Sequence, residues 1–292
     1  MVLKFNLIKI KFLFFLIFIY LLISLYIKNK YPIDNITLVT AFFKLETNRH
    51  TLNEYFIYIQ NLLLINASFV FYIDKNISKF IMEKRPKIYE NKTVWIETNF
   101  SDLFSYRHLR KDFTETYLLC EKKNLHSVPL YIIWAEKMNF LKRSIYKNYF
   151  NSKCFYWIDA GFFHDKNMSN YLYNWPSYDK CKKDPRVIIN QVRNLSNMEM
   201  NNIIHFDSIE HENFKHKANV GGGLFGGRFD YLIRFIYLYY KAIKLFKKKK
   251  KFIGSEQNIY TYVSFLHKDI INIINSNGNF HYFKLYLSSE YK

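Results

Sequence analysis

The chain has 292 residues, of which 50% are hydrophobic and 20% aromatic, and its formal net charge is +19 at pH 7. This composition excludes an intrinsically disordered chain, and the length allows a sizeable core. The positive charge suits a nucleic acid, a membrane surface or an anionic substrate, or only lysines on a solvated surface. Since the aromatic residues lie in apolar runs and no zinc-finger or RNP-type pattern occurs, we expect no nucleic-acid partner.

An apolar segment lies near the amino terminus. Residues 12–27 carry no charge and are flanked by lysines. As a helix rising about 1.5 Å per residue they span about 24 Å, enough for a thin early-secretory bilayer. A cleaved signal peptide is the alternative, but no small-residue cleavage site follows, so an uncleaved transmembrane signal anchor is favoured. The flanking charges predict that residues 1–11 are a cytosolic tail and that residues 28–35 are a short stem across the membrane.

Two further patterns concern the cellular compartment. The three cysteines allow at most one internal disulfide and lack metal-binding spacing. Asn-x-Ser/Thr sites are glycan acceptors in a secretory lumen, although some arise by chance in an asparagine-rich chain. We therefore expect a single-pass type II membrane protein that faces the endoplasmic reticulum or Golgi lumen. The seven acceptor asparagines are Asn35, Asn66, Asn76, Asn91, Asn99, Asn167 and Asn194.

The body of the chain begins with a strand, a helix and two further strands. β-Branched and aromatic residues predict a strand at 36–43. Apolar residues at helical spacing predict a helix at 53–65, and strands follow at 68–73 and 94–96. This order implies a parallel sheet with a right-handed crossover, and hence an α/β fold.

The second half of the body shows longer helices. Residues 100–128 are polar and predict helix and loop, whereas 130–150 have the spacing of a long helix. A strand is predicted at 186–191 and a helix at 229–246. The lysine run 247–251 is expected to be an exposed loop, and contact of this run with anionic lipid is a third functional hypothesis.

The stretch Phe155-Tyr156-Trp157-Ile158-Asp159-Ala160-Gly161 combines a short apolar run with an acid and small residues. Such a run predicts a strand buried on both faces. In an open α/β sheet, ligands bind at the carboxyl ends of strands, where Asp159 would lie. The alternative is an aspartate that caps a turn after a core strand.

Two later stretches are also candidates. Residues 221–227 contain five of the eight glycines of the chain. They predict either a close approach of a ligand to the backbone or a tight structural turn. Ser255 is a candidate N-cap of a helix at 258–266, with Glu256 in its first turn. An acid there is explained by the helix dipole or by catalysis.

Four stretches, in this order, resemble the HtrL/YibB family, which is placed among the GT-A-type glycosyltransferases. The resemblance runs from about residue 36 to 285. The stretches are Thr37–Phe43; Phe69–Asp74; Trp134–Arg143 with Asn148–Phe150 and Phe155–Phe162; and Gly221–Gly227 with Gly254–Gln257.

The resemblance implies a fold and a metal. Residues 36–292 would form a GT-A-like, nucleotide-sugar-binding α/β sandwich with a mixed, mainly parallel sheet. In such enzymes an Asp-x-Asp motif holds Mn²⁺ or Mg²⁺ against the donor diphosphate. Asp159 corresponds to the first acid and would be the metal ligand, whereas Gly161 stands where the second acid is expected. One carboxylate, together with water and the donor diphosphate, could still suffice to hold the metal.

The resemblance also implies the roles of residues. Asp159 and Glu256 would be catalytic, with Glu256 as a base in an inverting reaction or a nucleophile or ion-pair stabiliser in a retaining one. Lys137 and Arg143 would supply positive charge to phosphates. The nucleotide-sugar-binding residues would be Thr40, Phe42, Asp74, Lys137, Arg143, Asp159, Gly161, Gly222, Gly223 and Gln257.

These features together predict a membrane-anchored glycosyltransferase that moves a sugar from a nucleotide-sugar donor to a glycan or glycolipid acceptor. The alternative is a catalytically inactive lumenal or surface glycan-binding protein that retains the fold. The missing second acid of the metal motif favours this alternative.

Overall fold

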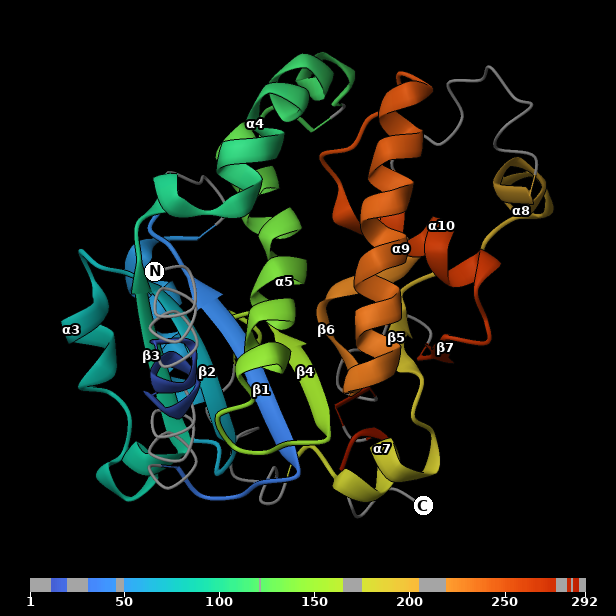
Figure 1. The fold of residues 1–292 in the computed structure, drawn as a ribbon. Helices are drawn as coiled ribbons and strands as arrows, with labels where there is room; N and C mark the ends of the chain where they lie inside the picture. Colours follow the sequence, from blue (N-terminus) through green and yellow to red (C-terminus); the bar gives the residue numbers. More distant parts are fainter. Residues whose placement is uncertain are drawn as a thin grey trace, which may run out of the picture.

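A mixed sheet forms the centre of the computed structural model (Figure 1). The structure describes residues 12–19, 31–45, 50–120, 122–164, 175–204, 219–276, 283–284 and 286–288. Within these ranges seven strands run in the order β3-β2-β1-β4-β6-β5-β7. They are β1 (Ile36–Phe42), β2 (Ser68–Asp74), β3 (Thr93–Thr98), β4 (Cys154–Ile158), β5 (Val187–Gln191), β6 (Val220–Arg228) and β7 (Ile271–Asn275).

The sheet is mainly parallel. β1 pairs in parallel with β2 and β4, β2 pairs with β3, and β5 pairs with β7. Only β6 runs antiparallel, between β4 and β5. The α/β class and the mixed, mainly parallel sheet are thus confirmed, and the parallel β1–β2 pair is the one that the first strand–helix–strand unit predicted.

Helices connect and cover the strands. They are α2 (Leu52–Leu63), α3 (Ser78–Met82), α4 (Phe104–Thr116), α5 (Val128–Lys147), α7 (Tyr178–Lys183), α8 (Asn197–Ile204), α9 (Phe229–Lys248) and α10 (Glu256–Leu266). Short 3₁₀ segments are η1 (Lys87–Lys92), η2 (Phe100–Asp102) and η3 (Tyr117–Leu119). Figure 1 shows α5 and α9 side by side over one face of the sheet.

Strand β4 is buried on both faces. Phe155 and Trp157 belong to the core cluster that includes residues of α5 and α9. Tyr156 and Ile158 belong to a separate cluster with Leu62 of α2 and Cys181 of α7. The two faces explain why β4 is a continuous apolar run in the sequence, and they place its carboxyl end between two layers of helices.

Local sequence signals determine where several helices begin and end. Helix α2 starts at a capping box, in which the Thr51 amide donates to Glu54 Oε2 (2.7 Å) and the Glu54 amide donates to Thr51 Oγ1 (3.2 Å). Helix α5 ends at Asn148, which adopts a left-handed conformation with φ of 38°. Helix α4 has a tertiary cap, since the buried Glu136 of α5 accepts from the amides of Phe104 (3.2 Å) and Ser105 (2.7 Å).

Three expectations about elements need correction. The glycine-rich stretch is the strand β6 rather than a tight turn, because pairing with β4 and β5 on both sides satisfies its backbone. Helix α9 continues to Lys248, so the lysine run begins inside a helix, and Lys247 pairs with Asp112 (2.6 Å). Strand β7 has no counterpart among the predicted elements.

The predicted anchor is described only in part. Residues 12–19 are helical, and residues 12–18 are large apolar side chains that are 46–67% exposed. Residues 20–27 lie outside the described ranges. Within the part of the chain that the structure describes, no helix has both the length and the apolar character needed to cross a bilayer.

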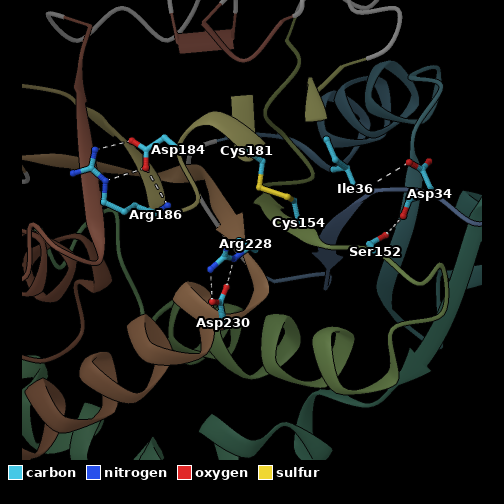
Figure 2. Close-up of a disulfide and its surroundings, with 9 residues drawn as sticks. All are labelled: Asp34, Ile36, Ser152, Cys154, Cys181, Asp184, Arg186, Arg228 and Asp230. Atoms are coloured by element: carbon cyan, nitrogen blue, oxygen red, sulfur yellow. Dashed lines mark hydrogen bonds and ion pairs between the residues drawn. A yellow bond between two sulfur atoms is a disulfide. The ribbon is translucent and has the colours of Figure 1, made fainter. Parts of the chain in front are cut away.

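A disulfide joins β4 to α7. Cys154 and Cys181 form it, and the remaining cysteine, Cys120, is a buried free thiol, in line with the limit of one internal disulfide. Figure 2 shows the bridge with the start of β1 beside it. There the Ser152 hydroxyl donates to the Asp34 carbonyl (2.6 Å), which fastens the residues that precede β1 to the loop that leads into β4.

Candidate functional site

A cavity of about 990 Å³ lies at the carboxyl ends of β1 and β4. Phe42 and Phe43 line it from the end of β1, and Asp159 to Phe162 line it from the segment after β4. Helix α5 contributes Lys137, and the beginnings of β6 and α10 contribute Gly222 and Glu256. The cavity therefore lies where the sequence predicted a ligand site, at the carboxyl edge of parallel strands.

Lys137 holds the two acids of the site together. Its Nζ lies 3.0 Å from Asp159 Oδ1 and 3.1 Å from Glu256 Oε1, and donates to the Gly222 carbonyl at 3.0 Å. These three acceptors match the three hydrogens of an ammonium group. The side chains of Lys137 and Glu256 are 2% and 5% exposed, whereas that of Asp159 is 40% exposed. Asp159 is thus the acid that a ligand in the cavity meets first.

Backbone and aromatic groups fix this network in place. Trp157 Nε1 donates to Asp159 Oδ1 at 2.7 Å, and the Asp159 amide donates to the Gly223 carbonyl at 2.8 Å. A Cβ atom at Gly222 would lie 2.6 Å from Glu256 Oε1. Only glycine lets the Glu256 carboxylate approach β6 so closely, which gives a physical reason for one glycine of the glycine-rich strand.

The pKa values of the buried pair reflect competing effects. Burial by itself would lower the pKa of Lys137, but the carboxylates of Asp159 and Glu256 outweigh it and raise the pKa, so the lysine stays charged. Burial raises the pKa of Glu256, against the opposing effect of the Lys137 ammonium. A carboxyl group with a raised pKa suits proton transfer near neutral pH.

The lining of the cavity as a whole is basic and aromatic. Among the described residues it holds four lysines against two carboxylates, together with three histidines. This balance favours an anionic ligand. The lysines are Lys44, Lys122, Lys137 and Lys284, the carboxylates Asp159 and Glu256, and the histidines His50, His126 and His164.

One wall of the cavity is a cluster of rings that the sequence did not indicate. Tyr55 of α2 packs on Phe42 with ring centroids 5.6 Å apart, and on His50 at 5.6 Å. His50 in turn lies 5.9 Å from His164. The sequence predicted Tyr55 only as part of the apolar face of a helix. The two histidines come from distant segments, so no local pattern could have found this wall.

Most of the predicted site residues line the cavity, and three do not. Those that line it are Phe42, Lys137, Asp159, Gly161, Gly222, Gly223, Glu256 and Gln257. Thr40 is fully buried within β1. Asp74, at the end of β2, accepts from the Asn76 amide at 2.9 Å and so forms a local turn. The Arg143 guanidinium lies 5.2 Å from the Tyr72 ring centroid, about 9 Å along α5 from Lys137. We therefore leave these three out of the candidate site.

The residues of the site do not fit the Mn²⁺ or Mg²⁺ that the resemblance implies. Asp159 Oδ1 already accepts from Trp157 and Lys137, and Gly161 offers no second carboxylate. Within the described ranges, no three His, Cys, Asp or Glu side chains are grouped so that they could hold a metal ion. A hard divalent cation needs several oxygen ligands, and here an ammonium lies between the two acids.

Comparisons with known proteins give one informative match. A family described as "Bacterial protein of unknown function (HtrL_YibB)" matches residues 34–288. The crystal structure of 4-diphosphocytidyl-2C-methyl-D-erythritol synthase from Anaerococcus prevotii DSM 20548 is similar at 8% identity and a TM-score of 0.34, over 86% of this chain and 89% of that one. A similarity this low carries no argument about function. No curated protein matches. Because the family match spans nearly the whole body, the chain belongs to the HtrL_YibB family.

Proposed function

We propose that this protein is a membrane-anchored glycosyltransferase that moves a sugar from a nucleotide-sugar donor to a glycan or glycolipid acceptor. The observation that carries the proposal is the network of Asp159, Lys137 and Glu256 at the carboxyl edge of a mainly parallel sheet, inside a cavity of about 990 Å³. A buried acid and a more exposed one held by a shared cation in a cleft are a frequent arrangement in active sites.

The shape and charge of the cavity support a nucleotide-sugar donor. Its volume is at the upper end of the range for small-molecule sites. The lysines of the lining suit a diphosphate, and the Phe42 and Tyr55 rings provide flat apolar surfaces for a base or a sugar.

The two acids support a transfer reaction. In the proposed step, the acceptor hydroxyl gives its proton to the Glu256 carboxylate and bonds to the anomeric carbon. The bond from that carbon to the diphosphate breaks, and the diphosphate leaves with the electron pair. If the reaction retains configuration, the carboxylate instead attacks or stabilises the anomeric carbon first. Lys137 keeps both carboxylates in position throughout, because all three of its hydrogens are already directed to protein acceptors.

Three features support a lumenal, membrane-anchored protein. The helical residues 12–18 expose apolar side chains on all sides. A disulfide such as Cys154–Cys181 persists mainly in oxidising compartments. Of the six predicted glycan-acceptor asparagines in the described ranges, only Asn66 is not exposed, so the other five are accessible to a glycosylating enzyme.

One observation favours the second candidate function, a catalytically inactive glycan-binding protein. Gly161 stands where metal-dependent relatives of this fold would have their second acid, so the protein lacks part of that machinery. A basic, aromatic cavity would also suit an anionic glycan.

A donor screen separates the two candidates. The full chain in detergent would be titrated calorimetrically with UDP- and GDP-sugars and assayed for donor hydrolysis, with Asp159→Asn as the comparison. We expect one donor class to bind and to be turned over by the wild type, and the variant to stay folded but lose turnover. Binding of glycans without binding of any donor would favour the second candidate, and full turnover by Asp159→Asn would remove Asp159 from the catalytic site.

A further inference from the structure

We propose that Lys137 takes the place of a divalent cation in this site, so that an anionic donor binds without a metal ion. The identity of the donor rests on the proposed function, whereas the position of the lysine does not. Three structural steps support the inference.

First, the ammonium occupies the position of a bridging cation. Lys137 Nζ lies between Asp159 Oδ1 (3.0 Å) and Glu256 Oε1 (3.1 Å). A divalent cation bridging these oxygens would lie about 2.1 Å from each. It would therefore overlap the nitrogen. The lysine side chain is 2% exposed and also donates to the Gly222 carbonyl, so three protein acceptors hold the ammonium in this position.

Second, the residues that the structure describes offer no other set of metal ligands beside Asp159. Asp159 Oδ1 is further occupied by Trp157 Nε1 at 2.7 Å. At Gly161, a Cβ atom would lie 3.2 Å from the Tyr55 ring, so an acidic side chain here would require the ring to shift. From this segment only Asp159 Oδ2 remains, so a divalent cation would have to take nearly all of its ligands from water and the donor phosphates.

Third, lysines can supply the positive charge that a metal would bring to a diphosphate. Lys44, Lys122 and Lys284 line the same cavity. The Lys284 ammonium lies 4.7 Å from the Phe162 ring centroid, beside the turn that carries Asp159. An ammonium group is a strong phosphate partner in proteins. Because Lys137 offsets part of the negative charge of the two acids, these three lysines give the cavity the positive charge that attracts a diphosphate.

The first experiment tests the wild type directly. The full chain in detergent would be titrated with Mn²⁺, following the loss of the hexaaqua Mn²⁺ signal by electron paramagnetic resonance. Binding of UDP and GDP would be measured calorimetrically in Mn²⁺ and in EDTA. We expect no Mn²⁺ binding, and nucleotide affinities that agree within about twofold between the two buffers. Stoichiometric Mn²⁺ binding, or an affinity that falls about 100-fold in EDTA, would overturn the proposal.

The second experiment removes the ammonium. Lys137→Met keeps the unbranched shape of the side chain but lacks its terminal ammonium and leaves Asp159 and Glu256 facing each other, so we expect this variant to gain Mn²⁺ binding. Lys142→Met, at an exposed position of the same helix, is the matched control and should gain none. Lys137→Arg keeps the charge and should also bind no Mn²⁺. A folded Lys137→Met variant that binds no Mn²⁺ would count against the proposal.

The two experiments separate failure of the inference from failure of the proposed function. If neither nucleotide binds in either buffer, the result contradicts a nucleotide-sugar donor and hence the proposed glycosyltransferase activity. The Mn²⁺ titrations of the wild type and the variants still decide whether Lys137 occupies the cation position.

Discussion

The ion pair between Lys137 and Glu256 allows a prediction about stability. Both side chains are buried, at 2% and 5% exposure, and their charged atoms lie 3.1 Å apart. Lys137→Met would leave the Glu256 carboxylate buried without a cation, and breaking a buried pair in this way costs about 3–5 kcal/mol. The second acid, Asp159, is 40% exposed, so water compensates for most of its loss. We therefore expect a loss of about 3–5 kcal/mol in the free energy of unfolding at neutral pH.

The same pair predicts how this loss depends on pH. The pKa of Glu256 is already raised by burial, and the Lys137 ammonium opposes that rise. Without the ammonium the folded-state pKa of Glu256 rises further above its unfolded value. A raised folded-state pKa of an acid gives stability below the unfolded pKa, and this stability is lost as pH rises through the folded pKa. The deficit of Lys137→Met relative to the wild type should therefore be small at pH 4 and grow toward pH 8.

A double-mutant cycle measures this coupling. Unfolding by urea would be followed by tryptophan fluorescence for the wild type, Lys137→Met, Glu256→Gln and the double variant, in the same detergent. Because Glu256→Gln removes the unpaired charge, the double variant should lose about 1–3 kcal/mol less than the sum of the single variants. Strictly additive losses, or a Lys137→Met deficit that does not change with pH, would refute the assignment of Glu256 as the buried partner of Lys137.

Three further predictions concern other parts of the fold. Gly222→Ala should destabilise the protein by about 1–3 kcal/mol and weaken donor binding, because its Cβ would lie 2.6 Å from Glu256 Oε1; unchanged denaturation and titration curves would contradict this. Arg85 is buried and donates to the carbonyls of Leu63, Ile65 and Ala67, so Arg85→Met should cost about 2–4 kcal/mol by urea denaturation; an unchanged unfolding midpoint would contradict this. Hydrogen bonds from Arg193 lower the pKa of Glu199 to about 2. The stability that the charged Glu199 adds is present above pH 4.5 and should fade as pH falls toward 2, so the free energy of unfolding of Glu199→Gln should change less than that of the wild type over that window.

The elements that followed from the sequence are those with strong local signals. The apolar run of β4 predicted a strand buried on both faces and placed Asp159 at its carboxyl end, and the first strand–helix–strand unit predicted the parallel pair of β1 and β2. Periodicity and capping residues act over a few neighbouring residues, so they can be recognised without knowledge of the rest of the fold. The family resemblance then brought Lys137, Glu256 and the glycines into the same candidate site.

Other features depended on contacts between distant segments. Glycine has a low preference for strands, so only pairing with β4 and β5 makes residues 220–228 the strand β6. The ring wall around Tyr55 joins α2 to segments far along the chain.

The residue whose interpretation changed most is Lys137. By sequence alone, it was a cation for phosphates on a helix, beside an acid that lacked its expected partner at position 161. The fold turns its side chain inward and surrounds the ammonium with Asp159, Glu256 and the Gly222 carbonyl, which come from three other segments of the chain. The sequence, through the family resemblance, indicated that Lys137, Asp159 and Glu256 belong to one site. Only the tertiary structure decided which of them neutralise one another, because that depends on distances of about 3 Å between groups as many as 119 positions apart in the chain.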